Sequence, residues 1–581
     1  MPHRATALLP LLAASTHHLP GEASYHLLRA SNGDLLESSL TRFVNSPACA
    51  PLQLAEWRHE LDDNCRIHGE GWQMLQQWRG TLGHPRSLGR CPDAQHVRLH
   101  QDQRPRIYNL LLIEASADHY WLLAFTDAEQ GNGYFQLDTG CIRIMVDLAG
   151  AHAAPGCQLQ LPGLLLLSGP DSDQLLASAA NYLPAPAATM SHLSGWCSWY
   201  HYYAAIPATA LRENLAAMQQ WPQLDYLLID DGYQRTMGDW LSPAPGFDGE
   251  LANLCREIHS AGKIPALWLA PLIASPDSQL LAHYPDWFVK DAQGQPLASD
   301  RISDGGWRLG PWYMLDGSHP QVCQHLEQLF AVLRHTFGIG LFKLDALLWG
   351  ALPGGQRHRP QLGDNGSYRA AIAAIRRGAG GAPLLGCNAP LWPSLGLFEA
   401  MRVGDDVERS DSRFTALADE LQGRMWMQQR LWLADPDCLL LQDAAGQHAS
   451  AGAYRLHLAT TAAMGGALLS GDRLNQLGTC ERQHLALLLQ LQQGQRSALS
   501  PLCQQRQVNW RSEMSSNQRL QFHWRVGADD GSWRLPLPAG LWHYHERLRD
   551  LQGLAAGELL LAAETLDGAV LELTAATSAK P

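Results

Sequence analysis

The sequence predicts an α/β protein with a central (β/α)8 TIM barrel, flanked by an N-terminal β-sandwich and a small C-terminal β-domain. Two observations support this prediction. Short apolar runs that alternate with polar residues dominate both ends of the chain, as is typical of antiparallel sheets. Between these ends, eight short apolar runs alternate with helical patterns over about 300 residues, which is the length and rhythm of a closed barrel.

The first part of the chain, residues 1–184, is predicted to form the β-sandwich. Its apolar runs are short and are separated by turn residues, for example at 120–125 and 141–146. A Pro/Ala-rich passage at 183–189 then changes the composition as a linker would. We therefore expect the next domain to begin near residue 185.

Residues 185–499 are predicted to form the barrel. Leu211, Leu215 and Met218 recur at i, i+4 and i+7, as on one face of a helix. Another helix is expected to begin at Ser318-His-Pro-Gln321, where serine and glutamine suit a capping box. A doubly wound open sheet is the alternative, but no glycine-rich phosphate loop follows the first strand. The eight predicted strands are 193–199, 226–230, 264–270, 341–345, 383–387, 400–404, 438–441 and 467–470.

The last part of the chain, residues 500–581, is predicted to form the C-terminal β-domain. Helical periodicity fades after about residue 500, and alternating runs return at 519–525 and 569–573.

Charge and composition restrict the partners and the compartment. A net charge of -13 without any run of Lys or Arg argues against nucleic acid or an anionic membrane as a partner. No stretch approaches the roughly 20 apolar residues that span a bilayer. Residues 1–15 make a poor signal peptide because Pro10 interrupts their short apolar run. We therefore expect a cytoplasmic protein, with secretion less favoured and a homo-oligomer left open.

Neither a metal nor another cofactor is expected. The twelve cysteines are scattered singly, without a C-x-x-C pair, so the sequence indicates neither a zinc ribbon nor a disulfide framework. Asp230 and Asp231 could together ligate a metal ion, but no His-x-His or similar motif accompanies them. No G-x-S-x-G motif indicates a serine nucleophile.

One predicted strand ends in an unusual way, with Lys343-Leu344-Asp345. Alternation along the strand places Lys343 and Asp345 on the same face at its C-terminal end. An ammonium and a carboxylate in an apolar setting fit either a buried ion pair or a reactive site.

Residues that end the strands of a barrel meet at one rim. Here they are aromatic residues, carboxylates and two cations, which suit a sugar: flat apolar faces for its ring and charged acceptors for its hydroxyls. Each has a structural alternative, since tryptophans also pack and aspartates also cap helices. The strand-end residues are Trp199, Tyr200, Asp230, Asp231, Trp268, Lys343, Asp345, Cys387, Asn388, Arg402, Asp405 and Asp406.

Two carboxylates on different strands can divide the work of glycoside hydrolysis. One attacks the anomeric carbon, and the other protonates the leaving oxygen. Asp345 beside Lys343 suits the nucleophile, and Asp406, four residues after Arg402, suits the acid/base.

At these residues the sequence resembles the glycoside hydrolase family 36 α-galactosidases, whose clan includes families 27 and 31. The matching segments are Gly195-Trp-Cys-Ser-Trp-Tyr200, Ile229-Asp-Asp-Gly-Tyr233 with Gly238-Asp-Trp240, Lys343-Leu-Asp345 and Met401-Arg-Val-Gly-Asp-Asp-Val407. The family's K-x-D motif implies that Asp345 is the nucleophile. Its R-x-x-x-D motif implies that Asp406, rather than Asp405, is the acid/base.

The resemblance also implies which residues contact the sugar. The loop Gly386-Cys-Asn-Ala-Pro390 stands where many members have a cysteine- and glycine-rich loop near the sugar's 2-position. Cys387 and Asn388 are therefore included, and the choice between galactose and N-acetylgalactosamine stays open. The other implied contacts are Trp199, Tyr200, Asp230, Asp231, Trp268, Lys343 and Arg402.

The activity that the resemblance implies is a retaining α-galactosidase. Such an enzyme hydrolyses terminal non-reducing α-D-galactosyl residues of oligosaccharides or glycoconjugates through a covalent glycosyl-enzyme. The alternatives are an α-N-acetylgalactosaminidase, a raffinose-type α-galactosyl transferase and, from another class, a catalytically inactive carbohydrate-binding protein. The N-terminal region is shorter than the family usually has, and the natural aglycone is not determined.

Overall fold

The computed structural model describes most of the chain. Residues 1–15, which are predicted to make a poor signal peptide, lie outside the described residues. The described ranges are 23–30, 33–40, 51–96, 104–150, 159–186, 190–247, 249–444, 446–492, 500–502, 507–509, 518–526 and 532–576.

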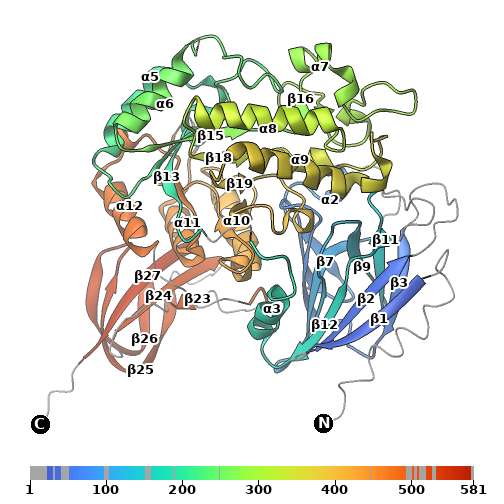
Figure 1. Ribbon diagram of the computed structural model, residues 1–581. Helices are drawn as coiled ribbons and strands as arrows, with labels where there is room; N and C mark the ends of the chain where they lie inside the picture. The colour runs from blue at the N-terminus through green and yellow to red at the C-terminus, as the bar shows by residue number, and fades with distance from the viewer. Residues whose placement is uncertain are drawn as a thin grey trace, which may run out of the picture. The chain divides into compact units, whose positions relative to one another are not determined.

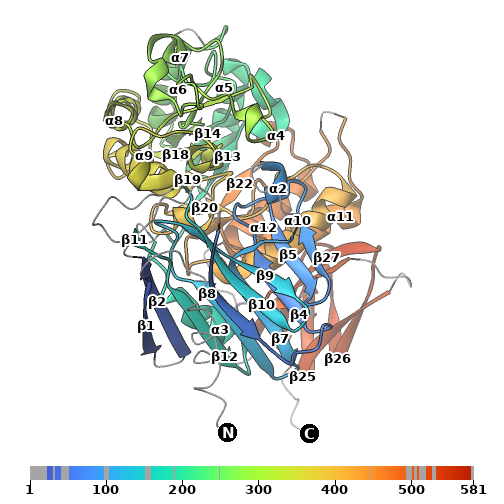
Figure 2. The same ribbon diagram turned by 90° about the vertical axis from the view of Figure 1, so that its right-hand side faces the viewer.

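Where the sequence predicts a β-sandwich, the N-terminal part of the chain forms an antiparallel sheet, which confirms the predicted antiparallel strands. Its strands alternate in burial where the sequence alternates: in β10, Ile142, Ile144 and Val146 are buried and the residues between them are less so. The predicted strands 120–125 and 141–146 correspond to β8 and β10. Strand β9 pairs with both β7 and β10, and Figure 2 shows these strands as parts of the N-terminal sheet. Within the described residues the sheet has twelve strands: β1 (Ala23–Ala30), β2 (Gly33–Leu40), β3 (Leu52–Arg58), β4 (Arg66–Glu70), β5 (Gln77–Thr81), β6 (Pro85–Leu88), β7 (Ile107–Ser116), β8 (His119–Phe125), β9 (Asn132–Asp138), β10 (Cys141–Asp147), β11 (Leu159–Gln160) and β12 (Leu164–Gly169).

The barrel that the sequence predicts is confirmed. Eight strands of the described chain form one sheet in the order β21-β20-β19-β18-β15-β14-β13-β22. A hydrogen bond of 2.8 Å from Ala467 N to Ala434 O links the chain at its two ends, so the eight strands form a nearly closed barrel. The strands are β13 (Ser194–Cys197), β14 (Tyr226–Ile229), β15 (Ile264–Leu269), β18 (Leu341–Leu344), β19 (Leu384–Gly386), β20 (Ala400–Arg402), β21 (Leu433–Asp435) and β22 (Leu468–Ser470).

The predicted seventh strand, at 438–441, is wrong. The strand at this place in the barrel is β21, which ends at Asp435 before the Pro436-Asp437 turn. Residues 438–441 are buried but form no regular strand; Leu439 pairs with Ser470 in an isolated bridge. Their apolar character reflects this burial, which periodicity alone cannot distinguish from a strand.

Helices follow the barrel strands. Leu211, Leu215 and Met218 are buried on α5, as predicted. The helix expected at 318–321 is α8, but its N-cap is His319 rather than Ser318, whose hydroxyl donates to Asp316 instead. Figure 1 shows α8 and α9 side by side. No helix of the described chain is long and apolar enough to cross a membrane. The principal helices are α5 (Ala208–Met218), α6 (Glu250–Ser260), α8 (Pro320–His335), α9 (Gly363–Ala379), α10 (Asp411–Arg424), α11 (Ala451–Met464) and α12 (Thr479–Leu491).

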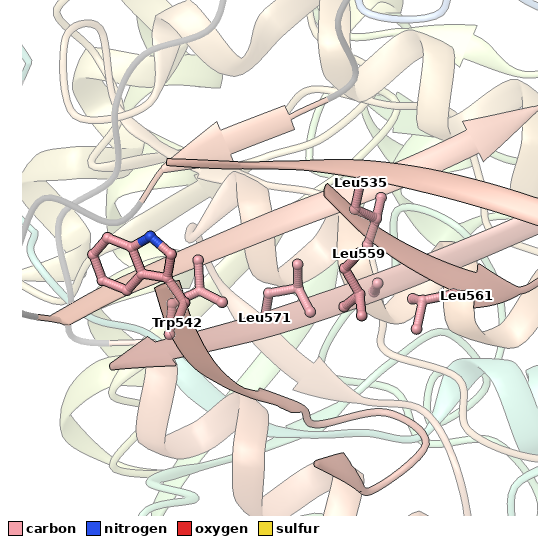
Figure 3. Close-up of a cluster of buried hydrophobic side chains, with 7 residues drawn as sticks. Leu535, Trp542, Leu559, Leu561 and Leu571 are labelled. Atoms are coloured by element: carbon pink, nitrogen blue, oxygen red, sulfur yellow. The ribbon is translucent and has the colours of Figure 1, made fainter. Parts of the chain in front are cut away.

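The C-terminal part is an antiparallel sheet in the order β23-β24-β27-β25-β26, and its predicted strands 519–525 and 569–573 lie in β24 and β27. Figure 3 shows the apolar cluster on this sheet, in which Leu535, Trp542, Leu559, Leu561 and Leu571 are buried. Burial of such a cluster is what stabilises a sheet face. The strands are β23 (Gln507–Asn509), β24 (Gln518–Val526), β25 (Ser532–Glu546), β26 (Leu551–Ala562) and β27 (Leu566–Ala575).

The chain divides into two compact units. Unit 1 comprises Met1–Thr189, Asp231–Glu257 and Pro265–Met401, and it holds the N-terminal sheet with β18 and β19. Unit 2 comprises Met190–Asp230, Ile258–Ile264 and Arg402–Pro581, and it holds β13, β14, β21, β22 and the C-terminal sheet. The three-domain division at residues 184 and 499 stays a prediction.

Candidate active site

Asp345 directly follows β18, and three N–H groups of unit 1 hold its carboxylate. The Trp268 indole Nε1 donates to Oδ2 at 3.0 Å. Asn388 Nδ2 and the backbone N of Ala346 donate to Oδ1 at 2.8 and 2.7 Å. Because donors approach both oxygens, the buried carboxylate is fixed in one orientation.

The elements around Asp345 explain how these donors reach it. Trp268 on β15 is the pairing partner of Lys343 on β18, so both residues lie near the C-terminal ends of neighbouring strands. Asn388 has a φ of 43°, a left-handed conformation that asparagine tolerates better than most residues. Its backbone N donates to Met74 Sδ at 3.1 Å, while the neighbouring Cys387 is buried and donates from its backbone to Leu344 O.

Asp231 follows β14 and is paired with an arginine that the sequence did not indicate. Arg308 donates to both carboxylate oxygens, through Nε to Oδ2 at 2.9 Å and through Nη2 to Oδ1. Gln234 Nε2 also donates to Oδ1, at 2.6 Å. A guanidinium on this carboxylate disfavours the metal alternative, and no cluster of three or more His, Cys, Asp or Glu in the described ranges is suited to a metal ion.

In unit 2, Arg402 joins two carboxylates. Its Nη2 donates to Asp406 Oδ1 at 2.9 Å and to Asp437 Oδ2 at 2.6 Å. Asp437 Oδ2 also accepts from Val407 N at 2.8 Å and from the Tyr200 hydroxyl. Burial, together with the nearby Asp406 and Asp437 carboxylates, raises the pKa of Tyr200 well above its usual range, so the phenol keeps the proton that it donates.

The structure distinguishes the two adjacent aspartates at the end of β20. Asp405 is buried, and its backbone N donates to Glu420 Oε2 at 2.9 Å. The Asp406 side chain is 50% exposed. Neither residue is the N-cap of α10, which is Ser410. Of the two aspartates, Asp406 is therefore the one whose carboxylate solvent reaches.

The motif around Gly195 supports Asp230 in unit 2. The backbone N of Asp230 donates to Ser198 Oγ at 2.9 Å, and Cys197 Sγ lies 3.4 Å from its Oδ2. Trp199 begins the short helix α4 (Trp199–Tyr202) and is partly buried, with its ring edge-on to Tyr203 at 5.3 Å. The strand-end residues of each unit thus lie where the barrel prediction expects them, after or at the end of a strand.

Two residues of these networks were missed from the sequence. Asp437 was missed because the seventh strand was placed at 438–441; a strand ending at Asp435 would have made Asp437 a strand-end carboxylate. Arg308 had no such signal, because it lies 77 residues from Asp231 in a segment without a motif.

Sequence comparisons match only short segments of the chain. No family model matches the chain. A segment of 114 residues is 28% identical to the bifunctional α-galactosidase/sucrose kinase AgaSK of Mediterraneibacter gnavus, which is 18% of this chain and 12% of that protein. A segment of 100 residues is 36% identical to an A type blood α-D-galactosamine galactosaminidase of Flavonifractor plautii, which is 16% of this chain and 9% of that protein. The matches thus span only a small part of these relatives.

The structural likenesses extend much further along the chain. The α-galactosidase TtGalA from Thermus thermophilus superposes with a TM-score of 0.66 and 23% identity, over 84% of this chain and 98% of TtGalA. TtGalA has been solved with p-nitrophenyl α-D-galactopyranoside and with stachyose. The GH36 α-galactosidase AgaA from Geobacillus stearothermophilus superposes with a TM-score of 0.65 and 14% identity, over 94% of this chain and 79% of AgaA.

Fold and strand-end residues together define a (β/α)8-barrel protein whose barrel strands are followed by carboxylates, arginines and aromatic residues. Its architecture is that of the glycoside hydrolase family 36 α-galactosidases. The resemblance that the sequence motifs indicate is therefore confirmed at the level of the fold.

Proposed function

We propose that the protein is a retaining α-galactosidase of glycoside hydrolase family 36, which hydrolyses terminal non-reducing α-D-galactosyl residues. The observation that carries the proposal is the Asp345 carboxylate, fixed by three N–H donors at the end of a barrel strand. A nucleophile needs this kind of orientation, because a covalent step depends on the approach of one oxygen to one carbon.

In the proposed first step, a carboxylate oxygen of Asp345 forms a bond to the anomeric carbon of galactose as the glycosidic C–O bond breaks. Asp406 gives its proton to the departing oxygen. In the second step, Asp406 takes a proton from water, the water oxygen attacks the same carbon, and the bond to Asp345 breaks. Two inversions at one carbon leave its configuration unchanged.

This division of labour is supported by the fold and by the surroundings of each carboxylate. Asp345 and Asp406 follow parallel strands of one barrel, and residues that follow barrel strands act on a common substrate in such enzymes. Asp345 is buried and held by donors, as suits a group that attacks. Asp406 is half exposed beside Arg402, which suits a general acid and base that must be reached by water.

The remaining predicted residues have proposed roles around the sugar. Asp230, Asp231 and Lys343 would bind hydroxyl groups, and Trp199 would pack against the ring face. Trp268 and Asn388 contact Asp345 directly, while Tyr200 and Arg402 contact Asp437. Besides contacting the substrate, Trp268 and Asn388 would therefore position the Asp345 carboxylate. Tyr200 and Arg402 would likewise position the Asp437 carboxylate. Cys387 would line the site near the sugar's 2-position.

A second candidate is activity on a 2-amino or 2-acetamido sugar. It is favoured by the segment that is 36% identical to the Flavonifractor plautii galactosaminidase. The resemblance puts the loop after β19, which holds Cys387 and Asn388, near the sugar's 2-position, where the two candidates differ. A raffinose-type transfer of galactose to a sugar acceptor would use the same two carboxylates.

A substrate panel tests the proposal. The wild type is assayed on p-nitrophenyl α-D-galactoside and on its 2-amino and 2-acetamido analogues, with and without sugar acceptors. We expect hydrolysis of the galactoside and at least about a 10³-fold loss in Asp345→Asn, because the nucleophile is removed. The control Asp286→Asn changes an exposed aspartate and should keep full activity.

Three outcomes would count against the proposal. Preference for an analogue would move the assignment to the second candidate, and galactose transfer instead of release would make the protein a transferase. Sugar binding without turnover by the wild type would place it in the non-catalytic class.

A further inference from the structure

Trp307 is a large apolar side chain that stays exposed in unit 1. It exposes 47% of its surface, although the two tryptophans that its ring contacts, Trp312 and Trp349, are almost completely buried. An exposed tryptophan carries no significance by itself, since single apolar residues are common on surfaces. Trp307 differs from such residues because buried rings pack against it and because the next residue, Arg308, binds Asp231.

Two buried indole rings pack against the Trp307 ring. The ring meets Trp312 edge-on, with centroids 4.5 Å apart and planes at 80°, and Trp349 at 5.6 Å and 76°. Trp312 and Trp349 pack on each other at 4.9 Å. Edge-to-face contacts of this kind are favourable, and they hold the exposed ring in one orientation.

The loop that carries Trp307 is also held in place. Trp312 Nε1 donates to Arg308 O at 2.7 Å. The preceding Gly306 has a φ of +100°, and a Cβ there would come within 2.4 Å of the Trp312 ring, so a larger residue would displace the loop. The exposed ring therefore needs little further ordering when a ligand covers it.

Trp307 is connected to the proposed sugar site through its neighbours in the chain and in the fold. The next residue, Arg308, donates to both oxygens of Asp231. Trp349, which contacts the Trp307 ring, stands four residues after Asp345 in the chain. The exposed indole is thus adjacent in the chain to an arginine that holds a proposed hydroxyl-binding carboxylate, and it packs against the segment that follows the proposed nucleophile.

We propose that Trp307 is the platform of a subsite on the leaving-group side, where it stacks on the sugar to which galactose is linked. This inference rests on the proposed function and specifies its substrate class, namely α-galactosides whose aglycone is itself a sugar. A flat, rigid indole suits the apolar C–H face of a pyranose or furanose ring. The partly exposed Arg308 guanidinium beside it can donate to that sugar's hydroxyl groups.

The test compares two substrates that differ only on the leaving-group side. Raffinose carries a sugar there, while α-galactosyl fluoride carries one atom that cannot reach a platform. Wild type, Trp307→Ala and Trp307→Phe are assayed on both. The matched control is Tyr284→Ala, which removes another aromatic ring that is 47% exposed in the same unit.

We expect kcat/KM for raffinose to fall about tenfold or more in Trp307→Ala and less in Trp307→Phe, which keeps a flat ring. The value for α-galactosyl fluoride should stay within about twofold of the wild type in both variants, because a leaving-group subsite does not contact it. Tyr284→Ala should change neither value.

An equal loss on both substrates would overturn the inference, since Trp307 would then only support the loop that carries Arg308. An unchanged value for raffinose would overturn it as well. Failure of the proposed function looks different: the wild type would hydrolyse neither substrate. Raffinose titrated calorimetrically into wild type and Trp307→Ala then decides the matter, because the platform requires weaker binding by the variant.

Discussion

At the scale of single residues, the two proposed catalytic carboxylates differ in what surrounds them. Asp345 is buried and accepts three hydrogen bonds from Trp268, Asn388 and Ala346. Asp406 is half exposed, and its carboxylate accepts a hydrogen bond from Arg402. Two carboxylates in unlike environments are the pattern by which glycosidases separate an attacking group from a proton donor.

This contrast predicts how Asp406→Ala behaves. We expect hydrolysis of raffinose to fall by about 10²- to 10⁴-fold, because a sugar alkoxide needs a proton to leave. Formation of the glycosyl-enzyme from p-nitrophenyl α-galactoside should fall much less, because nitrophenolate leaves without one. Steady-state rates on both substrates, with and without added azide, measure the effect, and azide should restore turnover of the aryl substrate.

The matched control is Glu213→Ala. Glu213 is 48% exposed and pairs with Arg473 at 2.7 Å, much as Asp406 is 50% exposed and pairs with Arg402 at 2.9 Å. The control should keep full activity on both substrates. Equal losses on raffinose and the aryl galactoside in Asp406→Ala with azide present would remove Asp406 from the acid role.

Sequence reasoning located the strand-end residues but not their partners. Asp345, Asp406 and Asp231 stand next to strands whose apolar runs are visible in the chain. Arg308 and Asp437 act through contacts between distant segments, which a single sequence does not record. The periodicity of a strand reports burial of its own residues, whereas a hydrogen bond across 77 residues depends on the whole fold.

At the scale of elements, α11 is a buried helix with a buried histidine. His457 Nε2 accepts a hydrogen bond from Leu440 N at 3.2 Å, and its ring stacks on Phe414 at 4.5 Å. Burial lowers the pKa of His457 to about 3. The pKa of His457 in the folded protein thus lies below its pKa in the unfolded chain. As the pH falls, the unfolded chain therefore takes up a proton at this residue while the folded protein still holds it neutral.

The sign of the pH dependence follows from this shift. Stability from His457 is complete above the unfolded pKa of about 6.5 and is lost as the pH falls toward the folded pKa, because only the unfolded chain takes up the proton. Between about pH 7.5 and pH 5.5, one such histidine costs about 1.4 kcal/mol of unfolding free energy. We expect His457→Gln, which keeps an acceptor but does not titrate, to lose that much less over this interval.

Urea unfolding at the two pH values measures this difference. The control Thr460→Ser changes a buried residue of the same helix that does not titrate, so it should keep the wild-type pH dependence. The assignment fails if wild type and His457→Gln lose the same free energy between the two pH values.

The one element that was misplaced shows what limits prediction at this scale. The strand β21 has three residues, and the run at 438–441 is longer and more apolar. Asp437 between them has a φ of 79°, which breaks any extended segment. Short barrel strands buried on both faces lack the alternation that would identify them, so apolar character alone selected the wrong run.

At the scale of the whole molecule, the order of folds along the chain was predictable. Alternating runs at both ends and the strand–helix rhythm between them correspond to the two antiparallel sheets and the nearly closed barrel. The division into two compact units was not, because each unit combines segments that are far apart in the chain. Such a division depends on long-range packing, which local patterns do not encode.

The central claim is that galactose is released with retention through a bond to Asp345. The most direct measurement follows the anomeric proton of the first-formed galactose by NMR during fast hydrolysis of p-nitrophenyl α-galactoside. The mechanism predicts that α-galactose appears first and that the β-anomer grows only later, by mutarotation. If β-galactose is the first product, water attacks the sugar directly, and Asp345 is not its covalent partner.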